Sequence, residues 1–176
     1  MSAKLLTDKR IGETNAEQQE LIRSISDDSE RLLKITGELL NMTQVETGNI
    51  QLKLLPTPPD LIANHATEVV QLQAQQKKVS PKMEIGGDLH PVHVDAEKTT
   101  WVLINFLTNA IRYSPEGSSV LVQIQSKNNK VLFIVKDQGP GIEERYLPRI
   151  FDRYFKVPGK YDNGGTGLGL AICKEF

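Results

Sequence analysis

The chain has 176 residues, of which 39% are hydrophobic, and its 21 basic and 22 acidic side chains leave a formal net charge of -1. This length fits one compact domain with an appendage, or two small domains. The near balance of charge gives no reason to expect the basic surface that nucleic-acid binding requires. Cys173 is the single cysteine, which excludes an intrachain disulfide and fits a reducing compartment. No apolar run approaches the roughly 20 residues that span a bilayer, and no signal peptide is visible, so we expect a soluble chain.

The first 50 residues are expected to be helical. Residues 1–10 read as the end of a helix and residues 11–14 as a turn, and a long helix is predicted from about Asn15 to about Thr47. Such a helix would bury its apolar stripe against other helices in a bundle, or against the rest of its own chain; the length of the stripe and the preceding turn favour a bundle. The stripe follows steps of four and three, with Asp28 in its one polar position, and consists of Leu21, Ile25, Leu32, Ile35, Leu39 and Met42.

Composition changes at residues 55–59, where three prolines exclude a continuing helix. We place a domain boundary near residue 50 and predict a short first strand at Gln51–Leu54. Asp60 is predicted to cap a helix. The buried side of that helix is expected to include Ile62, Ala66, Val69 and Leu72.

Helices and strands then alternate along the chain. Lys82–Ile85 is predicted to be a strand, and Asp95 to cap a helix over residues 96–113, which Pro115 follows. Residues 120–125 alternate apolar and polar side chains, Asn128-Asn129 is predicted to be a turn, and Val131–Val135 returns as a strand. Because Val131–Val135 is apolar on both faces, we expect it to be a central strand. The order predicts an α+β chain with a helical part followed by a mixed α/β part.

Three polar side chains share one face of the helix predicted at 96–113. Asn105, Asn109 and Arg112 are spaced by four and three residues in an otherwise apolar segment. Carboxamide oxygens can hold Mg²⁺, and a guanidinium group suits phosphate oxygens. Solvated helix faces carry such residues as well, so the pattern alone leaves both interpretations open.

Three later segments also combine backbone freedom with ligand-binding groups. Residues 137–142 (DQGPGI) offer a carboxylate beside backbone that can approach a ligand closely, or form a plain turn. Residues 164–170 (GGTGLGL) present backbone N–H groups before an apolar helix start, which suits phosphate, and their leucines argue against a flexible linker. They match neither a Walker loop nor the dinucleotide fingerprint. Phe151 and Phe155 are core anchors or fasten a segment over a ligand, and residues 158–164 have the composition of a lid.

Together these segments resemble a known family. NFLTNAIRYSP (105–115), DQGPGI (137–142), FDRYF (151–155) and GGTGLGLAI (164–172) are similar, in order and separation, to the N, G1, F and G2 boxes of sensor histidine kinases in the GHKL superfamily. Residues 30–52 resemble the second dimerisation helix and its connection to the catalytic domain. The resemblance implies that residues 1–50 are the C-terminal part of the dimerisation and histidine-phosphotransfer hairpin. Residues 51–176 would be a two-layer α/β sandwich of the Bergerat type, with a mixed sheet and an ATP lid.

The resemblance implies ATP and Mg²⁺ as ligands, and it assigns roles to particular residues. Asn105 and Asn109 would hold Mg²⁺ and the phosphates and act in catalysis. Arg112 would contact phosphate, Tyr113 would lie against the adenine, and Asp137 would accept a hydrogen bond from the adenine amino group. The remaining residues of the implied nucleotide site lie near the base, the triphosphate or the lid hinge, and are Gly139, Gly141, Ile142, Phe155, Lys156, Gly165, Thr166, Gly167, Leu168 and Gly169.

One position separates kinases from ATP hydrolases within this superfamily. Relatives that hydrolyse ATP carry a glutamate four residues before the second asparagine, where it activates water. Asn105 holds that position here, and a neutral amide cannot act as a general base. This favours transfer of phosphate to another acceptor.

The acceptor in this family is a histidine on the first dimerisation helix. His65, His90 and His93 lack the neighbours of that acceptor, so we predict that they are structural or surface residues. We expect the acceptor to precede Met1 and further strands to follow Phe176, and we expect this chain to bind nucleotide without phosphorylating itself.

The resemblance also implies partners and a location. It implies a homodimer through the 15–47 helix, a response-regulator receiver domain as partner, and the cytosolic part of a membrane-bound sensor. The alternative is a non-catalytic module of the same fold, in which nucleotide changes only partner binding.

Overall fold

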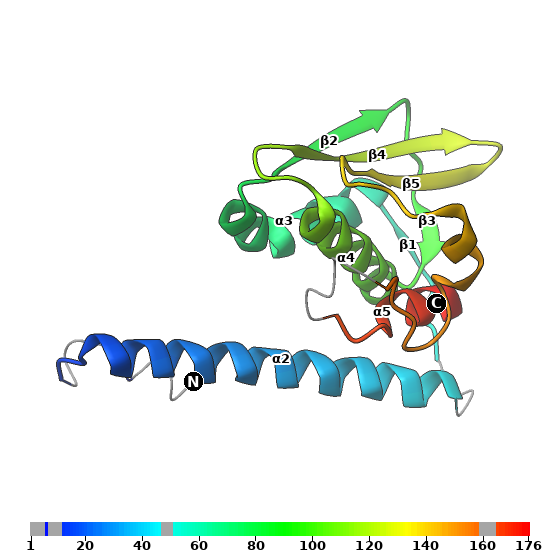
Figure 1. Cartoon of the computed structure of the whole chain (residues 1–176). Coiled ribbons are helices and arrows are strands. Elements are labelled where there is room, and N and C mark those ends of the chain that lie inside the picture. Colours follow the sequence, from blue (N-terminus) through cyan, green and yellow to red (C-terminus); the bar gives the residue numbers. More distant parts are fainter. Residues whose placement is uncertain (1–5, 7–11, 47–50, 159–164) are drawn as a thin grey trace. The chain divides into compact units, whose positions relative to one another are not determined.

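A computed structural model of the chain describes Leu6 and residues 12–46, 51–158 and 165–176 (Figure 1). The chain divides into two compact units, Met1–Gly48 and Asn49–Phe176, and each is considered by itself. The helix predicted at residues 1–10 lies outside the described residues except for Leu6, which is helical. Among the described helices, none has the length and apolar character needed to cross a membrane.

The first unit contains one long helix, α2 (Ala16–Glu46). Asn15 precedes it, and its Oδ1 accepts the N–H of Gln18 at 2.8 Å while Gln18 Oε1 accepts the N–H of Asn15 at 3.0 Å. This reciprocal pair satisfies two of the N–H groups that the start of a helix leaves without intrahelical partners. The long helix predicted over residues 15–47 is confirmed over Ala16–Glu46, the part of it that the structure describes as helical.

Most large apolar side chains of α2 are exposed. Leu33 is 72% exposed and Leu32 is 62% exposed. Within the stripe predicted from the sequence, Met42 is buried, whereas Leu21, Ile25, Leu32, Ile35 and Leu39 are exposed. The described residues therefore leave the greater part of this stripe in contact with solvent.

A three-stranded mixed sheet lies at the centre of the second unit. β2 (Ser80–Gly86) pairs in parallel with β4 (Ser119–Lys127), which pairs antiparallel with β5 (Lys130–Lys136). Asn128 and Asn129 join β4 to β5 with φ values of 51° and 60°, the left-handed conformation of a two-residue hairpin turn. The predicted strands and turn are confirmed.

The prediction that β5 is a central strand is wrong. β4 occupies the middle of the described sheet and β5 its edge. Leu132 and Ile134 of β5 lie opposite Gln125 and Gln123 of β4, on the same face of the sheet as these polar side chains. A strand with apolar residues on both faces can therefore lie at the edge of a sheet, and this pattern does not identify a strand with two neighbours.

Two helices, α3 (Pro59–Lys77) and α4 (Ala96–Tyr113), cover one face of this sheet (Figure 1). Val120, Val122 and Ile124 of β4 are buried, as predicted from their alternation. They pack with both helices in a single hydrophobic core. The core consists of Ile62, Ala63, Ala66, Val70, Ala74, Val79, Leu103, Leu107, Ala110, Ile111, Val120, Val122 and Ile124.

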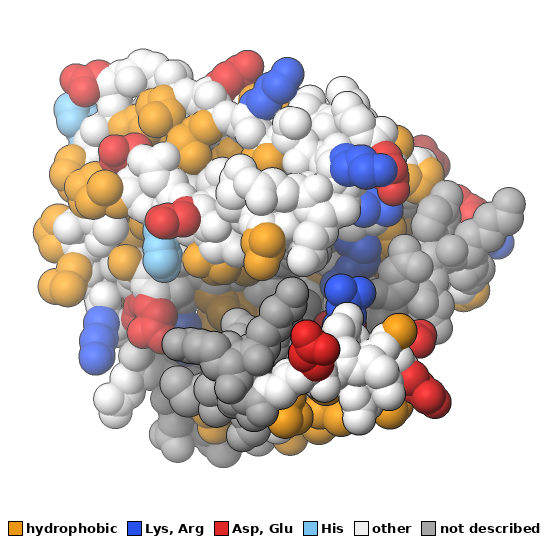
Figure 2. Space-filling view, turned by 90° about the vertical axis from the view of Figure 1, so that its left-hand side faces the viewer, with side chains coloured by type: hydrophobic (Ala, Val, Ile, Leu, Met, Phe, Trp, Pro, Cys, Tyr) orange, Lys and Arg blue, Asp and Glu red, His pale blue; other side chains and the backbone are white. Residues whose placement is uncertain are grey.

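The start and the buried face of α3 differ from the predictions. Pro58 occupies the N-cap position in place of Asp60, and Pro59 begins the helix, where its missing N–H costs no hydrogen bond. Ile62 and Ala66 are buried as predicted, but Val69 and Leu72 are exposed. The buried residues advance in steps of four through Val70 and Ala74, and the small alanines let α3 lie close to α4. Figure 2, seen from the side on which α3 lies, shows hydrophobic side chains at the surface.

A short two-stranded sheet connects the start of the second unit to α4. β1 (Leu55–Thr57) pairs antiparallel with β3 (Val92–Val94). The strand predicted at Gln51–Leu54 is wrong, since these residues have no regular structure and the strand begins at Leu55. Pro56 is tolerated inside β1 because a two-stranded ribbon leaves one edge of each strand without a ladder.

The short helix α5 (Gly169–Glu175) packs beside α4. The 3-10 helix η1 (Glu144–Arg149) precedes it in the chain. The ring of Phe176 meets the ring of Trp101 edge-on at 5.6 Å, and Lys98 Nζ lies 4.6 Å from the centre of the Phe176 ring. These contacts hold the segment after the glycine-rich residues against the first half of α4.

Candidate functional site

The candidate site is built on the polar face of α4. Its limits are those predicted, from the Asp95 cap to Tyr113. Asn105 is buried, and its Nδ2 donates to the carbonyl oxygen of Trp101 at 2.9 Å. Because the nitrogen is used inside the helix, Oδ1 of Asn105 is the atom left to accept from a ligand or bind a cation.

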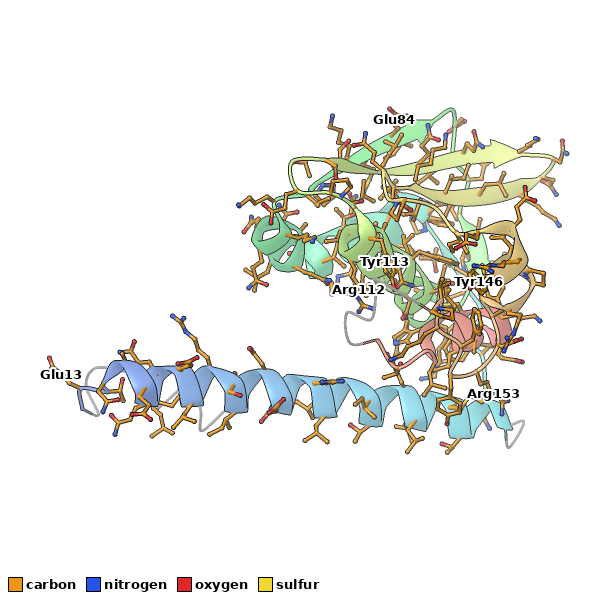
Figure 3. All side chains as sticks on the ribbon, in the orientation of Figure 1. Glu13, Glu84, Arg112, Tyr113, Tyr146 and Arg153 are labelled. Atoms are coloured by element: carbon orange, nitrogen blue, oxygen red, sulfur yellow. The ribbon has the colours of Figure 1, made fainter. Side chains whose placement is uncertain are left out.

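Asn109 and Arg112 follow Asn105 on the same face. Both side chains are half-buried. Figure 3 shows Arg112 and Tyr113 at the C-terminal end of α4. The described contacts give the side chains of Asn109 and Arg112 no hydrogen bond or ion pair. Their donors and acceptors are therefore free of competition from the described residues.

The glycine-rich residues approach this face so closely that a larger residue would displace the polar side chains there. An added Cβ at Gly169 would lie 2.6 Å from Oδ1 of Asn105, and one at Gly165 would lie 2.8 Å from Nη1 of Arg112. Real Cβ atoms essentially never approach other atoms below 3.0 Å. The last predicted segment therefore lies directly against the first, more than fifty residues earlier in the chain.

The segment after β5 meets the end of α4. Oδ1 of Asp137 accepts the N–H of Gly139 at 2.8 Å, and an added Cβ at Gly139 would lie 3.1 Å from the carbonyl oxygen of Tyr113. Asp137 and Tyr113 are both exposed. Since one carboxylate oxygen of Asp137 is held by the turn, the other can accept a hydrogen bond from a ligand beside Tyr113.

The segment containing the two phenylalanines joins the glycine-rich residues through its backbone. The N–H of Tyr154 donates to the carbonyl oxygen of Gly167 at 2.9 Å. Gly167 has a φ of +76°, and an added Cβ would lie 2.7 Å from the carbonyl carbon of Tyr154. Phe155 is half-buried, with the guanidinium of Arg149 4.4 Å from its ring centre and the ring of Tyr146, labelled in Figure 3, at 6.1 Å. Phe155 thus anchors this segment to η1.

Some predicted site residues take no part in the contacts described above between α4, the segment after β5 and the glycine-rich residues. Gly141 has a φ of +73° with open space where a Cβ would be, and Ile142 is exposed. Lys156 is exposed as well. Thr166 accepts the N–H of Leu168 at 3.3 Å through its hydroxyl, and Leu168 is buried. Apart from Pro158, the stretch predicted to be a lid lies outside the described residues.

Sequence reasoning missed two residues of this region. The Ser114 side chain is buried directly after Tyr113, and its hydroxyl has no hydrogen-bond partner among the described residues. Tyr154 adopts a φ of 60°, which is uncommon for a bulky residue, where its backbone meets Gly167. The position of Ser114, a polar residue at the end of a predicted helix, is a signal that could have identified it. The sequence contains no such signal for Tyr154.

The three histidines lie at exposed positions outside α4. His65, His90 and His93 are all exposed, as predicted for surface residues. His65 projects from α3, and His93 belongs to β3.

Comparison with known proteins identifies the part of the chain that carries the site. Residues 94–176 match the family described as Histidine kinase-, DNA gyrase B-, and HSP90-like ATPase. This match covers slightly less than half of the chain. The chain is also 36% identical over 162 residues to the sensor protein KdpD of Clostridium acetobutylicum, a match that covers 90% of this chain and 18% of that protein.

Solved structures with the same fold include those of two longer chains. The chain matches full-length ShkA in complex with AMPPNP with a TM-score of 0.76 at 24% identity, over 93% of this chain and 34% of that one. It matches the histidine kinase ThkA in complex with the response regulator protein TrrA with a TM-score of 0.70 at 20% identity, over 99% and 48% of the two chains. The predicted α+β fold of the GHKL type is confirmed. This chain spans less than a fifth of the length of KdpD.

Proposed function

We propose that this chain binds ATP with Mg²⁺ and is the catalytic core of a sensor histidine kinase. In this proposal it transfers the γ-phosphate of ATP to a histidine, from which the phosphate passes to an aspartate of a response regulator. The observation that carries the proposal is the joining of Gly165 and Gly169 to Arg112 and Asn105 across the α4 face. The match of residues 94–176 to an ATPase family gives independent support.

The phosphates and the cation are assigned to the α4 face. Oδ1 of Asn105 is free to face a cation because Nδ2 is bonded to Trp101, and Asn109 lies one turn further on the same face. Oxygen ligands and incomplete protein coordination suit Mg²⁺, which keeps waters and phosphate oxygens in its shell. Arg112 would pair with phosphate oxygens, while Gly165, Thr166, Gly167, Leu168 and Gly169 would supply backbone donors.

The adenine is assigned to the other end of the site. Tyr113 and Gly139 touch through their backbones, so a base lying beside Tyr113 would be within reach of Asp137. The second carboxylate oxygen of Asp137 would accept from the exocyclic amino group. Gly141 and Ile142 would border the base, and Phe155 and Lys156 would approach from the side of η1.

The chemistry proposed for this chain is positioning and charge stabilisation. Bound Mg²⁺ neutralises charge that develops on the phosphate oxygens during transfer. Asn105 and Arg112 hold the triphosphate in line with the acceptor, and Asn105 cannot deprotonate water because its amide is neutral and its nitrogen is already bonded. This favours transfer to a side chain over hydrolysis.

The acceptor in this proposal is a histidine that the chain does not itself supply. His65, His90 and His93 are exposed residues outside α4 and lack the sequence neighbours of the acceptor, so in this proposal the chain would not phosphorylate itself. A receiver domain is proposed as the next partner, since the related fold of ThkA is seen with the response regulator TrrA.

Dimerisation is proposed through α2. Residues 1–50 would be the end of the dimerisation hairpin and residues 51–176 the catalytic domain. The exposed apolar stripe of α2, with Leu32 at 62% and Leu39 at 51% exposed, has the spacing that a partner helix would cover.

A calorimetric titration of the chain with Mg²⁺ and a non-hydrolysable ATP analogue tests the nucleotide site. Asn109→Ala and Asp137→Asn should each weaken binding about tenfold or more, since each removes a hydrogen bond or ligand to a charged or polar group. Asn64→Ala on α3 and Asp88→Asn in the loop after β2 make the same chemical changes at exposed positions outside the site, and should leave affinity unchanged.

Absence of binding by a folded chain would contradict the proposal, as would equal losses in the site variants and their controls. Appearance of phosphohistidine on an added helical substrate would separate a kinase from a module that only binds nucleotide.

A further inference from the structure

One carboxylate joins two segments that are far apart in the sequence. Oδ1 of Asp95 accepts the N–H of Lys98 at 3.0 Å, in the first turn of α4. Oδ2 of the same side chain accepts the N–H of Lys53 at 2.9 Å, 42 residues earlier. Lys53 lies in the irregular segment Gln51–Leu54, which begins the described part of the second unit; we refer to Gln51–Leu54 as the connecting segment.

The two bonds have different consequences. The bond to Lys98 is an ordinary helix cap, and the carbonyl of Asp95 also accepts from the N–H and the hydroxyl of Thr99. The bond to Lys53 adds nothing to the cap. It extends the β1–β3 pairing upstream, because β3 ends at Val94, directly before Asp95.

Asp95 is ionised at neutral pH, which strengthens both bonds. Burial disfavours the charged form, but the backbone N–H groups of Lys98, Lys53 and Glu97 outweigh it, so the pKa of Asp95 lies below its ordinary value of 3.8. Hydrogen bonds to an ionised acceptor are stronger than those between neutral groups.

Displacements at the first turn of α4 would reach its polar face. Leu103, Leu107 and Ile111 are all buried in the core, so α4 is closely packed along its length, and such packing transmits strain. The connecting segment is thereby attached, through one side chain, to the helix that carries Asn105 and Asn109.

We infer that Asp95 is a positioning residue that couples the connecting segment to nucleotide binding on α4. Nucleotide bound to the α4 face orders the connecting segment through Asp95, and a held connecting segment favours nucleotide. The inference rests on the proposed function, since it requires that the α4 face binds nucleotide.

Two variants separate the coupling from the cap. Asp95→Asn keeps one acceptor oxygen for Lys98, and asparagine caps helices as well as aspartate does, but its Nδ2 cannot accept from Lys53. Lys53→Pro removes the N–H donor and leaves the carboxylate in place. Glu84→Gln makes the same carboxylate-to-amide change on β2, where Glu84 accepts from Gln123 at 2.7 Å, and serves as the matched control.

The experiment measures both sides of the coupling on the whole chain. Hydrogen exchange of the amides in residues 52–55 is followed with and without Mg²⁺ and AMPPNP, and the dissociation constant is taken from calorimetry. In the unmodified chain and in Glu84→Gln, nucleotide should slow this exchange by about fivefold. In Asp95→Asn the slowing should vanish and the dissociation constant should rise by a similar factor, because coupling between two sites is reciprocal.

The remaining outcomes are decisive. If Lys53→Pro matches Asp95→Asn and the double variant is no weaker than either, both act through the same bond. If Asp95→Asn binds nucleotide as tightly as Glu84→Gln, or retains the nucleotide-dependent slowing, Asp95 is only a cap and this inference alone is overturned. If the folded unmodified chain binds no nucleotide, the proposed function fails and takes the coupling with it.

Discussion

α2 and α4 are both amphipathic helices that begin at a capping Asn or Asp, but the apolar side is buried in α4 and mostly exposed in α2. α4 buries Leu103, Leu107 and Ile111 in the core shared with α3 and the sheet. α2 leaves Leu32, Leu33 and Leu40 more than half exposed. In the proposed function, α4 therefore acts through its polar face, whereas α2 acts through its apolar face.

The difference shows what helical periodicity can and cannot establish. Steps of three and four identify a face in both helices. They do not show whether other elements of the same chain bury that face. α4 has a sheet and a second helix to pack on, and its few polar residues stand out against that background; α2 has no such cover among the described residues.

The largest expected effect concerns the apolar face of α2. Replacing both Leu32 and Leu39 with glutamate should convert a dimer to monomers, because burying one leucine contributes about 1.5–3 kcal/mol and each chain would lose two. The dimer should weaken at least about a thousandfold, measured by sedimentation equilibrium. Leu72→Glu is the matched control, since Leu72 is 67% exposed but lies on α3. An unchanged dimer in the double variant would show that the exposed stripe of α2 is not the contact.

The next largest effect concerns the polar face of α4. Gly169→Ala would place a methyl group 2.6 Å from Oδ1 of Asn105 and displace the carboxamide that is proposed to bind the cation. Forcing an extra methyl group into close-packed surroundings costs about 1–3 kcal/mol, so affinity for the ATP analogue should fall about tenfold. Calorimetry on the folded variant measures this directly.

A second glycine supplies the contrast between the helices. Gly37 lies inside α2 with nothing within 4 Å of an added Cβ, so Gly37→Ala should leave nucleotide affinity unchanged. It should also stabilise α2 by about 1 kcal/mol, because alanine favours a helix more than glycine does. Equal affinity losses in the two variants would mean that the close approach at Gly169 has no role in binding.

Local signals predicted much of the fold. α4 was placed to the residue because Asp95 and Pro115 mark its ends, and β4 because its apolar residues alternate cleanly. Prediction failed in two places. The prolines of residues 55–59 argued against a strand where β1 lies, and the predicted buried face of α3 wrongly included Val69 and Leu72. The placement of β5 depended on its neighbours, which no local pattern contains.

The candidate site followed a similar division. Spacing placed Asn105, Asn109 and Arg112 on one face, but only the fold brings Gly169 to Asn105 and Gly139 to Tyr113. The resemblance supplied what spacing could not, namely that distant segments act together. The left-handed backbone of Tyr154 and the buried hydroxyl of Ser114 depend on tertiary packing, so only the structure reveals them.

A smaller effect tests the start of α2. Asn15→Ala removes the acceptor for the N–H of Gln18 and should cost about 1 kcal/mol, seen as faster hydrogen exchange of residues 16–19. Gln18→Glu keeps an acceptor for the N–H of Asn15 and adds a negative charge near the helix start, so it should not increase fraying. Faster exchange in both variants, or in neither, would contradict the role given to this pair.

The smallest effect tests the corresponding cap of α4 through pH. The pKa of Asp95 is lowered by backbone N–H groups that outweigh burial, so its ionised form contributes stability above the ordinary value of 3.8. That contribution should be lost as pH falls below 3.8 and through the folded pKa. The urea midpoint of Asp95→Asn should therefore lie below that of the unmodified chain at pH 7, and the gap between the two midpoints should narrow at pH 3.

Because Asn15 at the start of α2 carries no charge, the effect of Asn15→Ala should not depend on pH in this range. A gap for Asp95→Asn that stays constant from pH 7 to pH 3 would mean that the charge of Asp95 adds nothing to its two hydrogen bonds, and the two caps would then differ only in geometry.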